Sequence, residues 1–542
     1  MAAGGRTVMI STMSSTRFSR RSLLRAACAS AACAALPAMA PAGEARRPNI
    51  LLIMADDMGF SDIGCYGSEI ATPNLDRLAY DGLRCTHFYN TGRCCPTRAS
   101  LLTGLYPHQT GVGHMVENRG HPSYQGYLND SCVTIAEAIR PAGYHALMVG
   151  KWHVGDKRGC WPFDRGFEHY YGLVSGGSNY FRKDPNRIFA EDDREIDPTG
   201  GEGYYLTDDF TRAAVQYIDQ YARKPEPFFM YVAYTAPHWP LHARPEDIAR
   251  YKGRYMVGWD EIRRRRLARQ FELGIIDRRT ALTPRDPKAP AWDTLSQEQK
   301  ELADLKMAVY AAQIECMDRG IGRMVEMLKK TGAFDNTLII FLSDNGGCAE
   351  EINRGKPGVP PGGVDSFMSY GLPWANASNT PFRLYKHWVH EGGICSPLIA
   401  HWPGRIKPGT ITDQIGHVID FMATCLDLAG AEYPRRFRDR DITPLEGKSL
   451  VPVFEGRQRQ GHQAVFFEHE GNRAVRQGRW KLVARHNQPW ELYDMATDRV
   501  ELNDLADREP QKVKELAEMY RAWAQRCRVM PWGQISSRKP QA

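Results

Sequence analysis

The chain has 542 residues, 42% of them hydrophobic and 25% charged, an ordinary composition for a globular protein that buries a large core. Its net charge of +7 at pH 7 includes five arginines in the first 40 residues, where lysine, aspartate and glutamate do not occur. The remaining chain therefore carries only +2, which gives no support for nucleic acid or another polyanion as a partner.

Residues 1–40 have the features of an export signal. Arg20 and Arg21 resemble a twin-arginine motif, a weakly apolar run follows at 26–36, and 38–40 reads as a cleavage site. The run is too short to span a membrane. We expect the twin-arginine machinery to export the folded protein to the periplasm or the medium, without stable membrane insertion. A disordered basic N-terminus is the alternative.

Five short apolar runs predict strands of a parallel sheet. Each run is continuously apolar, as expected for strands covered on both faces. Helical patterns lie between them, one over Thr207–Arg223 with Thr207 as its N-cap and one from about Leu305 to Lys330. This alternation indicates a doubly wound α/β domain. The runs are Asn49–Ala55, His145–Val149, Phe228–Ala233, Thr337–Ser343 and Pro397–His401.

A helix is also predicted from Cys94 to Gly104. Pro96 suits a first helical turn and Gly104 suits a helix end. Arg98 lies four residues after Cys94, so both side chains project from one face. A thiol at a positive helix N-terminus beside an arginine is well placed to meet an anion.

Polar residues follow four of the predicted strands. Ligands of doubly wound sheets bind at the carboxyl ends of the strands, so these residues are candidates for a common site. Three carboxylates and one amide among them form an all-oxygen set that suits calcium. Helix capping and a tight turn are the structural alternatives for these oxygens. The candidates are Asp56 and Asp57, Asp344 and Asn345, Lys151 and His153, and His238.

The string Cys94-x-Pro-x-Arg98, followed by Leu-Leu-Thr-Gly, resembles the signature of type I sulfatases, over about residues 48–450. The resemblance implies an alkaline phosphatase-like fold: a mixed or parallel sheet flanked by helices. It also implies that a maturase converts Cys94 to formylglycine (3-oxoalanine). Cys95 does not fit, because its proline lies one residue too close.

The same resemblance implies roles for the other candidates. One calcium ion would be bound by Asp56, Asp57, Asp344, Asn345 and modified Cys94, and the catalytic set would be Cys94, Arg98, Lys151, His153, His238 and Lys386. Hydrated formylglycine would attack the sulfur of an aryl sulfate or sulfated carbohydrate. His238, assisted by Lys386, would protonate the leaving oxygen. His153 would then accept a proton as the sulfated intermediate releases sulfate.

Two other functions remain open at this stage. One is a phosphonate or phosphate ester hydrolase of the same fold, and the other is a non-catalytic anion-binding homologue with unmodified Cys94. The role of the segment Glu468–Arg473 also remains open. Its sequence fits either the end of a strand followed by a turn, or a segment that lines the pocket.

Three domains are expected: the signal at 1–40, a catalytic domain at 46–450, and a C-terminal α+β subdomain at 451–542. Short strand-like runs and a helix from about Pro510 to Arg526 predict an antiparallel sheet with one covering helix in the last of these.

Two further segments are predicted to be irregular. Residues 252–300 read as a charged surface insertion with a short helix, and 365–379 read as a loop. The run Arg263–Arg266 is interpreted as a solvated face, with a site for anionic substrate as the alternative. Thirteen cysteines occur without a zinc-type Cys-x-x-Cys spacing, and most are expected to be reduced, with a pairing of Cys65 and Cys85 left open.

Overall fold

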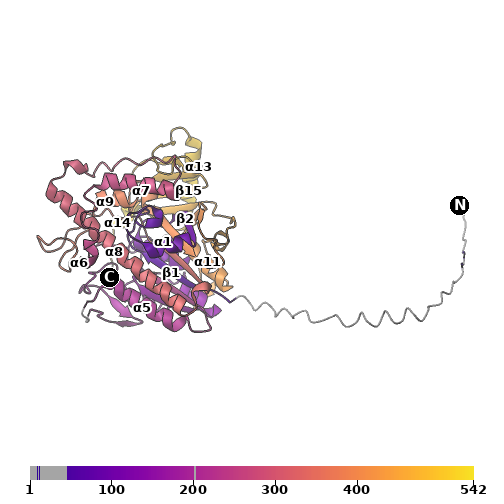
Figure 1. The fold of residues 1–542 in the computed structure, drawn as a ribbon. Helices are drawn as coiled ribbons and strands as arrows, with labels where there is room; N and C mark the ends of the chain where they lie inside the picture. Colours follow the sequence, from indigo (N-terminus) through magenta and orange to yellow (C-terminus); the bar gives the residue numbers. More distant parts are fainter. Residues whose placement is uncertain (1–8, 10, 12–45, 200–202, 542) are drawn as a thin grey trace, which may run out of the picture. The chain divides into compact units, whose positions relative to one another are not determined.

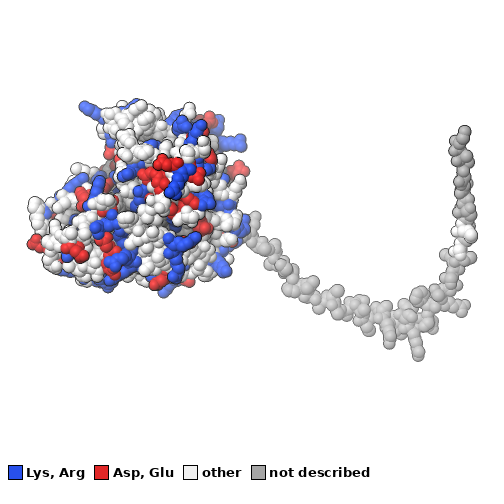
Figure 2. Space-filling model, turned by 90° about the horizontal axis from the view of Figure 1, so that it is seen from above, with Lys and Arg blue, Asp and Glu red and all other residues white. Residues whose placement is uncertain are grey.

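The computed structural model of the protein describes residues 9, 11, 46–199 and 203–541. Apart from residues 9 and 11, the predicted export signal lies outside the described residues. Arg47–Ala542 form one compact unit. On the face of this unit seen in Figure 2, basic and acidic side chains are interspersed. Among the described residues, no helix combines the length and the apolar character needed to cross a bilayer.

The unit is built on a large mixed sheet (Figure 1). Its middle strands run parallel, β8, β1, β7, β3 and β4 in that order, and antiparallel pairs occur toward both ends. The spatial order is β10 (Thr410–Thr412), β2 (Leu83–Tyr89), β9 (Cys395–His401), β8 (Thr337–Ser343), β1 (Asn49–Ala55), β7 (Phe228–Ala233), β3 (His145–Gly150), β4 (His169–Leu173), β5 (Phe189–Glu191) and β6 (Arg194–Glu195), with β11 (Gly416–His417) paired to β2.

All five predicted strands form, but the direction predicted for one of them is wrong. β9 runs antiparallel to both of its neighbours, β2 and β8. A continuous apolar run reports that a strand is covered on both faces and carries no information about its direction. An antiparallel strand begins at the sheet edge where its parallel neighbours end. The segment that precedes β9 therefore lies at the carboxyl ends of the parallel strands, where the sequence predicts the site.

Helices cover both faces of the sheet, as expected for a doubly wound domain. Alternate side chains of β1 point to opposite sides, with Leu51 and Ile53 in one core and Ile50 and Leu52 in the other. The first core is completed by α1 (Pro73–Tyr80), α5 (Leu206–Tyr221) and α8 (Gln297–Lys330). The second is completed by α2 (Cys94–Thr103), α4 (Ile135–Ile139) and α11 (Asp420–Ala429). In Figure 1, α5 and α8 lie side by side.

Shorter helices complete the unit, and some differ from the sequence-based prediction. α5 begins one residue earlier than predicted, with Tyr205 as N-cap, so Thr207 is a buried helical residue. α8 begins earlier too, because Ser296 and Gln299 form a capping box. The predicted loop at 365–379 contains a helix, α9. The remaining α-helices of the described residues are α3 (Pro107–Thr110), α6 (Pro245–Ala249), α7 (Trp259–Leu273), α9 (Leu372–Ser378), α10 (Glu391–Ile394), α12 (Val451–Phe454), α13 (Pro510–Arg526) and α14 (Trp532–Ser536).

The arginine run in α7 is only half solvated, which corrects the prediction. Arg263 and Arg266 are buried, whereas Arg264 and Arg265 lie on the exposed side of the helix. The Arg266 guanidinium lies 2.6 Å from an Asp62 carboxylate oxygen and 2.8 Å from Glu69. Residues three apart lie on the same face of a helix, which explains why Arg263 and Arg266 are buried together. The ion pairs of Arg266 hold α7 to the segment that follows β1.

Replacing Arg266 by methionine is expected to lower the free energy of unfolding by about 3–5 kcal/mol, because the Asp62 carboxylate would remain buried without its partner. Urea denaturation followed by circular dichroism measures the change. Arg264→Met is the matched control, since the Arg264 side chain is 67% exposed; it is expected to shift stability by less than about 0.5 kcal/mol. Equal effects of the two variants would mean that the buried pairs do not hold α7 in place.

The C-terminal α+β region forms as predicted. Strands β14 (Val465–His469), β15 (Asn472–Gln477), β16 (Trp480–Ala484) and β17 (Glu491–Asp494) make an antiparallel sheet, and α13 packs on it (Figure 1). β14 and β15 are joined by a two-residue turn, Glu470-Gly471, in which both residues have positive φ, 52° and 81°. This is the backbone of a tight hairpin turn.

The eleven cysteines of the described segments are all unpaired. Cys65 and Cys85 thus form no disulfide with each other, and most of the eleven are buried. They behave as small apolar core residues, as the sequence indicated.

Candidate active site

The predicted nucleophile lies at the start of α2. Arg93 is the extended N-cap residue, Cys94 opens the helix with 1% exposure, and Gly104 ends it in the left-handed conformation with φ of 71°. A hydrogen bond with Cys95 lowers the pKa of the Cys94 thiol well below its usual value; burial opposes this, and Lys151 and His153 reinforce it. The helix start therefore favours a negative charge at position 94.

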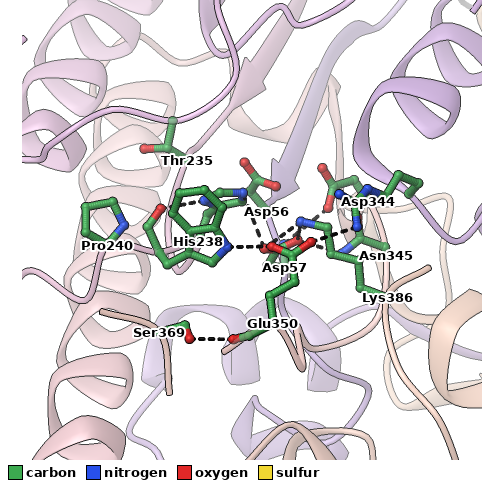
Figure 3. A network of polar contacts seen from close by, with 12 residues as sticks. Asp56, Asp57, Thr235, His238, Pro240, Asp344, Asn345, Glu350, Ser369 and Lys386 are labelled. Carbon is green, nitrogen blue, oxygen red and sulfur yellow. Dashed lines mark hydrogen bonds and ion pairs between the residues drawn. The ribbon is translucent and has the colours of Figure 1, made fainter. Parts of the chain in front are cut away.

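The predicted oxygen ligands meet at the carboxyl ends of two adjacent parallel strands. Ala55 of β1 pairs with Ser343 of β8, so the residues that follow each strand are neighbours. The Asp57 amide donates to an Asp344 carboxylate oxygen at 3.2 Å, and the Asn345 amide group donates to an Asp57 carboxylate oxygen at 2.8 Å. Figure 3 shows this group.

Two oxygens of this group are left for a cation. Asp56 Oδ1 and Asn345 Oδ1 are buried and have no hydrogen-bond partner within the protein. Burial and the adjacent Asp56 carboxylate also raise the pKa of Asp344 well above its usual value, although Arg98 opposes them. Unpaired buried oxygens and mutually repelling carboxylates fit a hard divalent cation with oxygen ligands.

Arg98 is bound to this carboxylate group. Its guanidinium lies 2.7 Å from Asp344 Oδ2 and 3.7 Å from Asp56 Oδ2, and it donates to the carbonyl oxygen of Lys151 at 3.0 Å. All three ion-pairing side chains are 0% exposed. Arg98 is therefore fixed between helix α2 and the side chains of Asp56, Asp57, Asp344 and Asn345, which we call the oxygen cluster. Its positive charge there favours negative charge both on the cluster and at position 94.

Lys151 and His153 follow β3, which ends at Gly150, and His153 has a positive φ of 57°. Lys151 Nζ lies 2.5 Å from Asp56 Oδ2. A ring nitrogen of His153 lies within 4.8 Å of the Cys94 and Cys95 sulfurs. Burial and the Lys151 charge lower the pKa of His153 to about 4, so the ring is neutral at pH 7.

His238 and Lys386 complete the site on either side of Asp57 (Figure 3). His238 follows β7, and its Nε2 lies 3.4 Å from Asp57 Oδ2; Lys386 precedes β9, and its Nζ lies 2.8 Å from Asp57 Oδ1. A Cβ at Gly346 would lie 1.8 Å from the Gly392 carbonyl oxygen. Glycine at 346 therefore lets the turn after β8 pack against the segment that contains Lys386.

One residue of the site, Glu350, was not predicted from the sequence. Glu350 accepts from Arg93 at 2.9 Å and from the Trp239 indole at 2.9 Å. Burial alone would raise the pKa of Glu350, but the charges of Lys386 and Arg93 hold it at about 2. Glu350 lies in an irregular segment after Asp344, and no motif distinguishes it from other surface glutamates.

The C-terminal hairpin also reaches this region, through the middle of the segment Glu468–Arg473. His469 and Glu470 join His114 and His387 in what we call the histidine cluster. Glu470 Oε1 lies 2.7 Å from His114 Nε2, and Glu470 Oε2 lies 3.2 Å from His387 Nδ1.

Glu468 and Arg473, the charged residues at the two ends of that segment, lie elsewhere. Glu468 pairs with His108 at 2.7 Å, and the Arg473 guanidinium lies 4.4 Å from the centre of the Trp490 ring. Period-2 alternation separates neighbours along a strand, so only the strand end and the turn reach the site.

A cleft of about 760 Å³ adjoins the site. Arg93, Glu350, Lys386 and His387 are among the residues that line it. Arg285 and Arg485 line it as well. A ligand bound through an anionic group near Lys386 would have space here for the remainder of its structure.

The Sulfatase family model matches residues 48–431, well over half of the chain. The chain belongs to the sulfatase family. A second family model, for the C-terminal region of N-sulphoglucosamine sulphohydrolase, matches residues 382–526 of this sulfatase. Family membership makes the protein a sulfuric ester hydrolase.

Relatives and solved structures agree with this assignment. The sulfatase is 37% identical over 517 residues to an uncharacterized sulfatase of Schizosaccharomyces pombe, covering 88% of the chain and 93% of that relative. It is 36% identical over 436 residues to an arylsulfatase of Klebsiella aerogenes, covering 76% of the chain and 93% of the relative. The crystal structure of Ps i-CgsB in complex with k-i-k-neocarrahexaose superposes with a TM-score of 0.66 at 27% identity, covering 88% and 93% of the two chains. The fold is that of alkaline phosphatase-like sulfatases.

Proposed function

We propose that this sulfatase hydrolyses aryl sulfates or sulfated carbohydrates, using calcium and a formylglycine formed from Cys94. The observation that carries the proposal is the convergence of Cys94, the oxygen cluster and five cationic or imidazole side chains at one sheet edge. The two buried oxygens without partners, on Asp56 and Asn345, support the metal. The arylsulfatase relative and the carbohydrate named with the solved structure support the substrate range.

Calcium would be held by Asp56, Asp57, Asp344 and Asn345, with residue 94 beside them. Once bound, it supplies a fixed positive charge for the sulfate oxygens, and hydrated formylglycine supplies two hydroxyl groups on one carbon. Unmodified cysteine or serine lacks the second hydroxyl. That is the chemical reason to modify Cys94, whose helix-start position already favours negative charge.

The side chains around residue 94 neutralise the charge of the sulfate and transfer protons. Lys151 and Lys386 neutralise charge on the sulfate, and Arg98, fixed by Asp344, keeps a cation beside the nucleophile. His238, on the opposite side of Asp57 from Lys386, donates a proton to the leaving oxygen. His153, neutral at pH 7, accepts a proton from residue 94.

Mass spectrometry of the tryptic peptide 94–98 tests the modification. Protein co-expressed with a formylglycine-generating maturase should show an aldehyde at position 94 and a thiol at position 95. A thiol at both positions under these conditions would rule out the proposed nucleophile.

The substrate class is tested by comparing the turnover of an aryl sulfate with that of the matching phosphate and phosphonate esters. A preference for the phosphorus esters would favour the alternative, a phosphonate or phosphate ester hydrolase.

The pH dependence of kcat/KM should reflect His153. Because its pKa is lowered to about 4, the ring is neutral above that pH and gains a proton as the pH falls through about 4. Once protonated, His153 can no longer accept a proton. We therefore expect kcat/KM to stay high from pH 7 to about pH 5 and to decrease below about pH 5.

Stopped assays in overlapping buffers, with circular dichroism at each pH, measure this effect. His153→Asn should have a low kcat/KM that does not change in this range. An acidic limb near pH 6.5 in the wild-type protein, the ordinary histidine range, would contradict the assignment.

We further propose export through the twin-arginine pathway, directed by residues 1–40. Replacing Arg20 and Arg21 together by lysine should leave active enzyme in the cytoplasm and remove it from the periplasm or medium. Fractionation followed by assay measures this distribution. Unchanged distribution would reject the route without affecting the catalytic proposal.

A further inference from the structure

The histidine cluster is assembled from three distant parts of the chain. His114 follows α3, His387 follows Lys386, and His469 and Glu470 come from the end of β14 and its turn. The rings of His114 and His469 are stacked, with centroids 5.5 Å apart and an interplanar angle of 11°. The His387 ring meets His469 edge-on at 5.5 Å. Three imidazoles thus surround one carboxylate.

His469 is the member whose chemistry is unexplained by the protein alone. It is 0% exposed, and neither of its ring nitrogens has a hydrogen-bond partner. A buried imidazole normally satisfies at least one nitrogen, because leaving a buried polar group unpaired costs about 1–3 kcal/mol. The Nδ1 atom of His114 is also buried and without a hydrogen-bond partner, although Glu117 lies 3.8 Å away. These atoms have lone pairs or protons available for a ligand.

The available atoms fit a metal of the zinc class. One ligand atom each from His114, His469 and Glu470 lie within 4.8 Å of one another. Ligands of a tetrahedral zinc ion with bonds of about 2.0–2.1 Å are about 3.3 Å apart, so a small adjustment of these side chains would close the site. Imidazole nitrogen favours zinc-type ions over calcium, which prefers oxygen alone.

The surroundings of the cluster suit metal ligation as well. His387 Nδ1, 3.2 Å from Glu470 Oε2, is placed to hold the Glu470 carboxylate. The Asn472 side-chain nitrogen lies 3.3 Å from the His387 Nε2 atom and orients that ring. Ligating carboxylates in metal sites are commonly held by such a second contact.

We infer that His114, His469 and Glu470 form a binding site for a divalent transition metal such as zinc, separate from the oxygen cluster at Asp57. The site lies at the side of the substrate cleft, because His387 lines that cleft and is the neighbour of Lys386. With three protein ligands, a tetrahedral ion keeps one position for water or for an oxygen atom of the substrate. The inference concerns metal binding and does not depend on the nature of the sulfate ester.

The test must exclude a competing site, since Cys94, Cys95 and His153 also bring possible ligands within 4.8 Å of one another. Untagged full-length protein carrying Cys94→Ala is therefore used throughout. The protein is stripped with a chelator, supplied with excess calcium, and titrated with zinc chloride by isothermal calorimetry. Zinc and calcium per chain are measured by mass spectrometry after gel filtration.

The expected result is one zinc ion per chain, with calcium content unchanged. His469→Ala and the milder Glu470→Gln should each weaken zinc binding by at least about 100-fold. His401→Ala is the matched control, because His401 is also buried with an unpartnered Nδ1 but lies against Phe334 with no carboxylate cluster; it should bind zinc as the parent does. No zinc retained by the parent, or equal binding by parent and Glu470→Gln, would overturn the inference.

Discussion

Replacing Cys94 by alanine is expected to lower kcat/KM for an aryl sulfate by about 10⁵-fold or more, the scale seen when a nucleophile is removed from a hydrolase. The change removes the thiol at position 94, from which we propose that the aldehyde is made. Protein stability should change little, since alanine is favourable in a helix and the site is small. Initial rates with enzyme matured in the same cells measure the effect.

The adjacent Cys95→Ala is the control for Cys94→Ala. Cys95 is equally buried and begins the same helix, but its thiol is not at the predicted signature position. Its replacement should retain most activity once residue 94 is modified. Similar losses in the two variants would mean that the choice of cysteine is wrong, whereas loss in neither would place the nucleophile elsewhere.

Replacing Asp344 by alanine should remove the bound calcium and lower kcat/KM by at least about 10³-fold, because a metal supplies several kcal/mol of stabilisation to a charged transition state. A second effect follows from its contact with Arg98 at 2.7 Å. Without Asp344, the buried guanidinium loses its nearest carboxylate and keeps the Asp56 carboxylate at 3.7 Å and the Lys151 carbonyl oxygen at 3.0 Å. Metal analysis of the gel-filtered variant and urea denaturation measure the two effects separately.

Asp365→Ala is the matched control for Asp344→Ala. Asp365 is an acid 41% exposed at its side chain, and it pairs with a surface lysine at 3.1 Å. Calcium content and kcat/KM should both remain at wild-type values in this variant. Undiminished calcium in Asp344→Ala would show that the oxygen cluster is not the metal site, whatever the activity.

Several parts of the fold follow directly from the sequence. The bounds predicted for Asn49–Ala55, Phe228–Ala233 and Thr337–Ser343 agree with β1, β7 and β8. These runs are apolar throughout because both faces of each strand are covered by helices. β2 was not predicted, because Arg84 and Thr86 interrupt its apolar character although both are buried.

The site residues that follow strands were predictable for a topological reason. Parallel strands end at one edge, so Asp56, Asp344, His238 and Lys151 were expected to meet there, and the structure brings them together. Glu350 was not predictable, since its position depends on contacts with Arg93 and Trp239 from other segments.

The arginine run and the histidine cluster show a second limit of the sequence. Which arginines of α7 are buried depends on Asp62 and Glu69, about two hundred positions away. The role of His469 depends on how the C-terminal sheet docks beside β9, through contacts such as Lys481 with Glu391 at 2.8 Å. Neither pairing has a local pattern.

The two-residue turn between β14 and β15 has a consequence for how such enzymes diverge. Glu470 in this turn contacts His387, which lines the cleft, while the sheet behind it is held by its own contacts with α13. Exchanging the tip of one hairpin would alter the support of His387 at the cleft and leave the sulfate-cleaving residues in place. Related enzymes can thus acquire new substrates by varying a few C-terminal residues, without selection having to rebuild the catalytic centre.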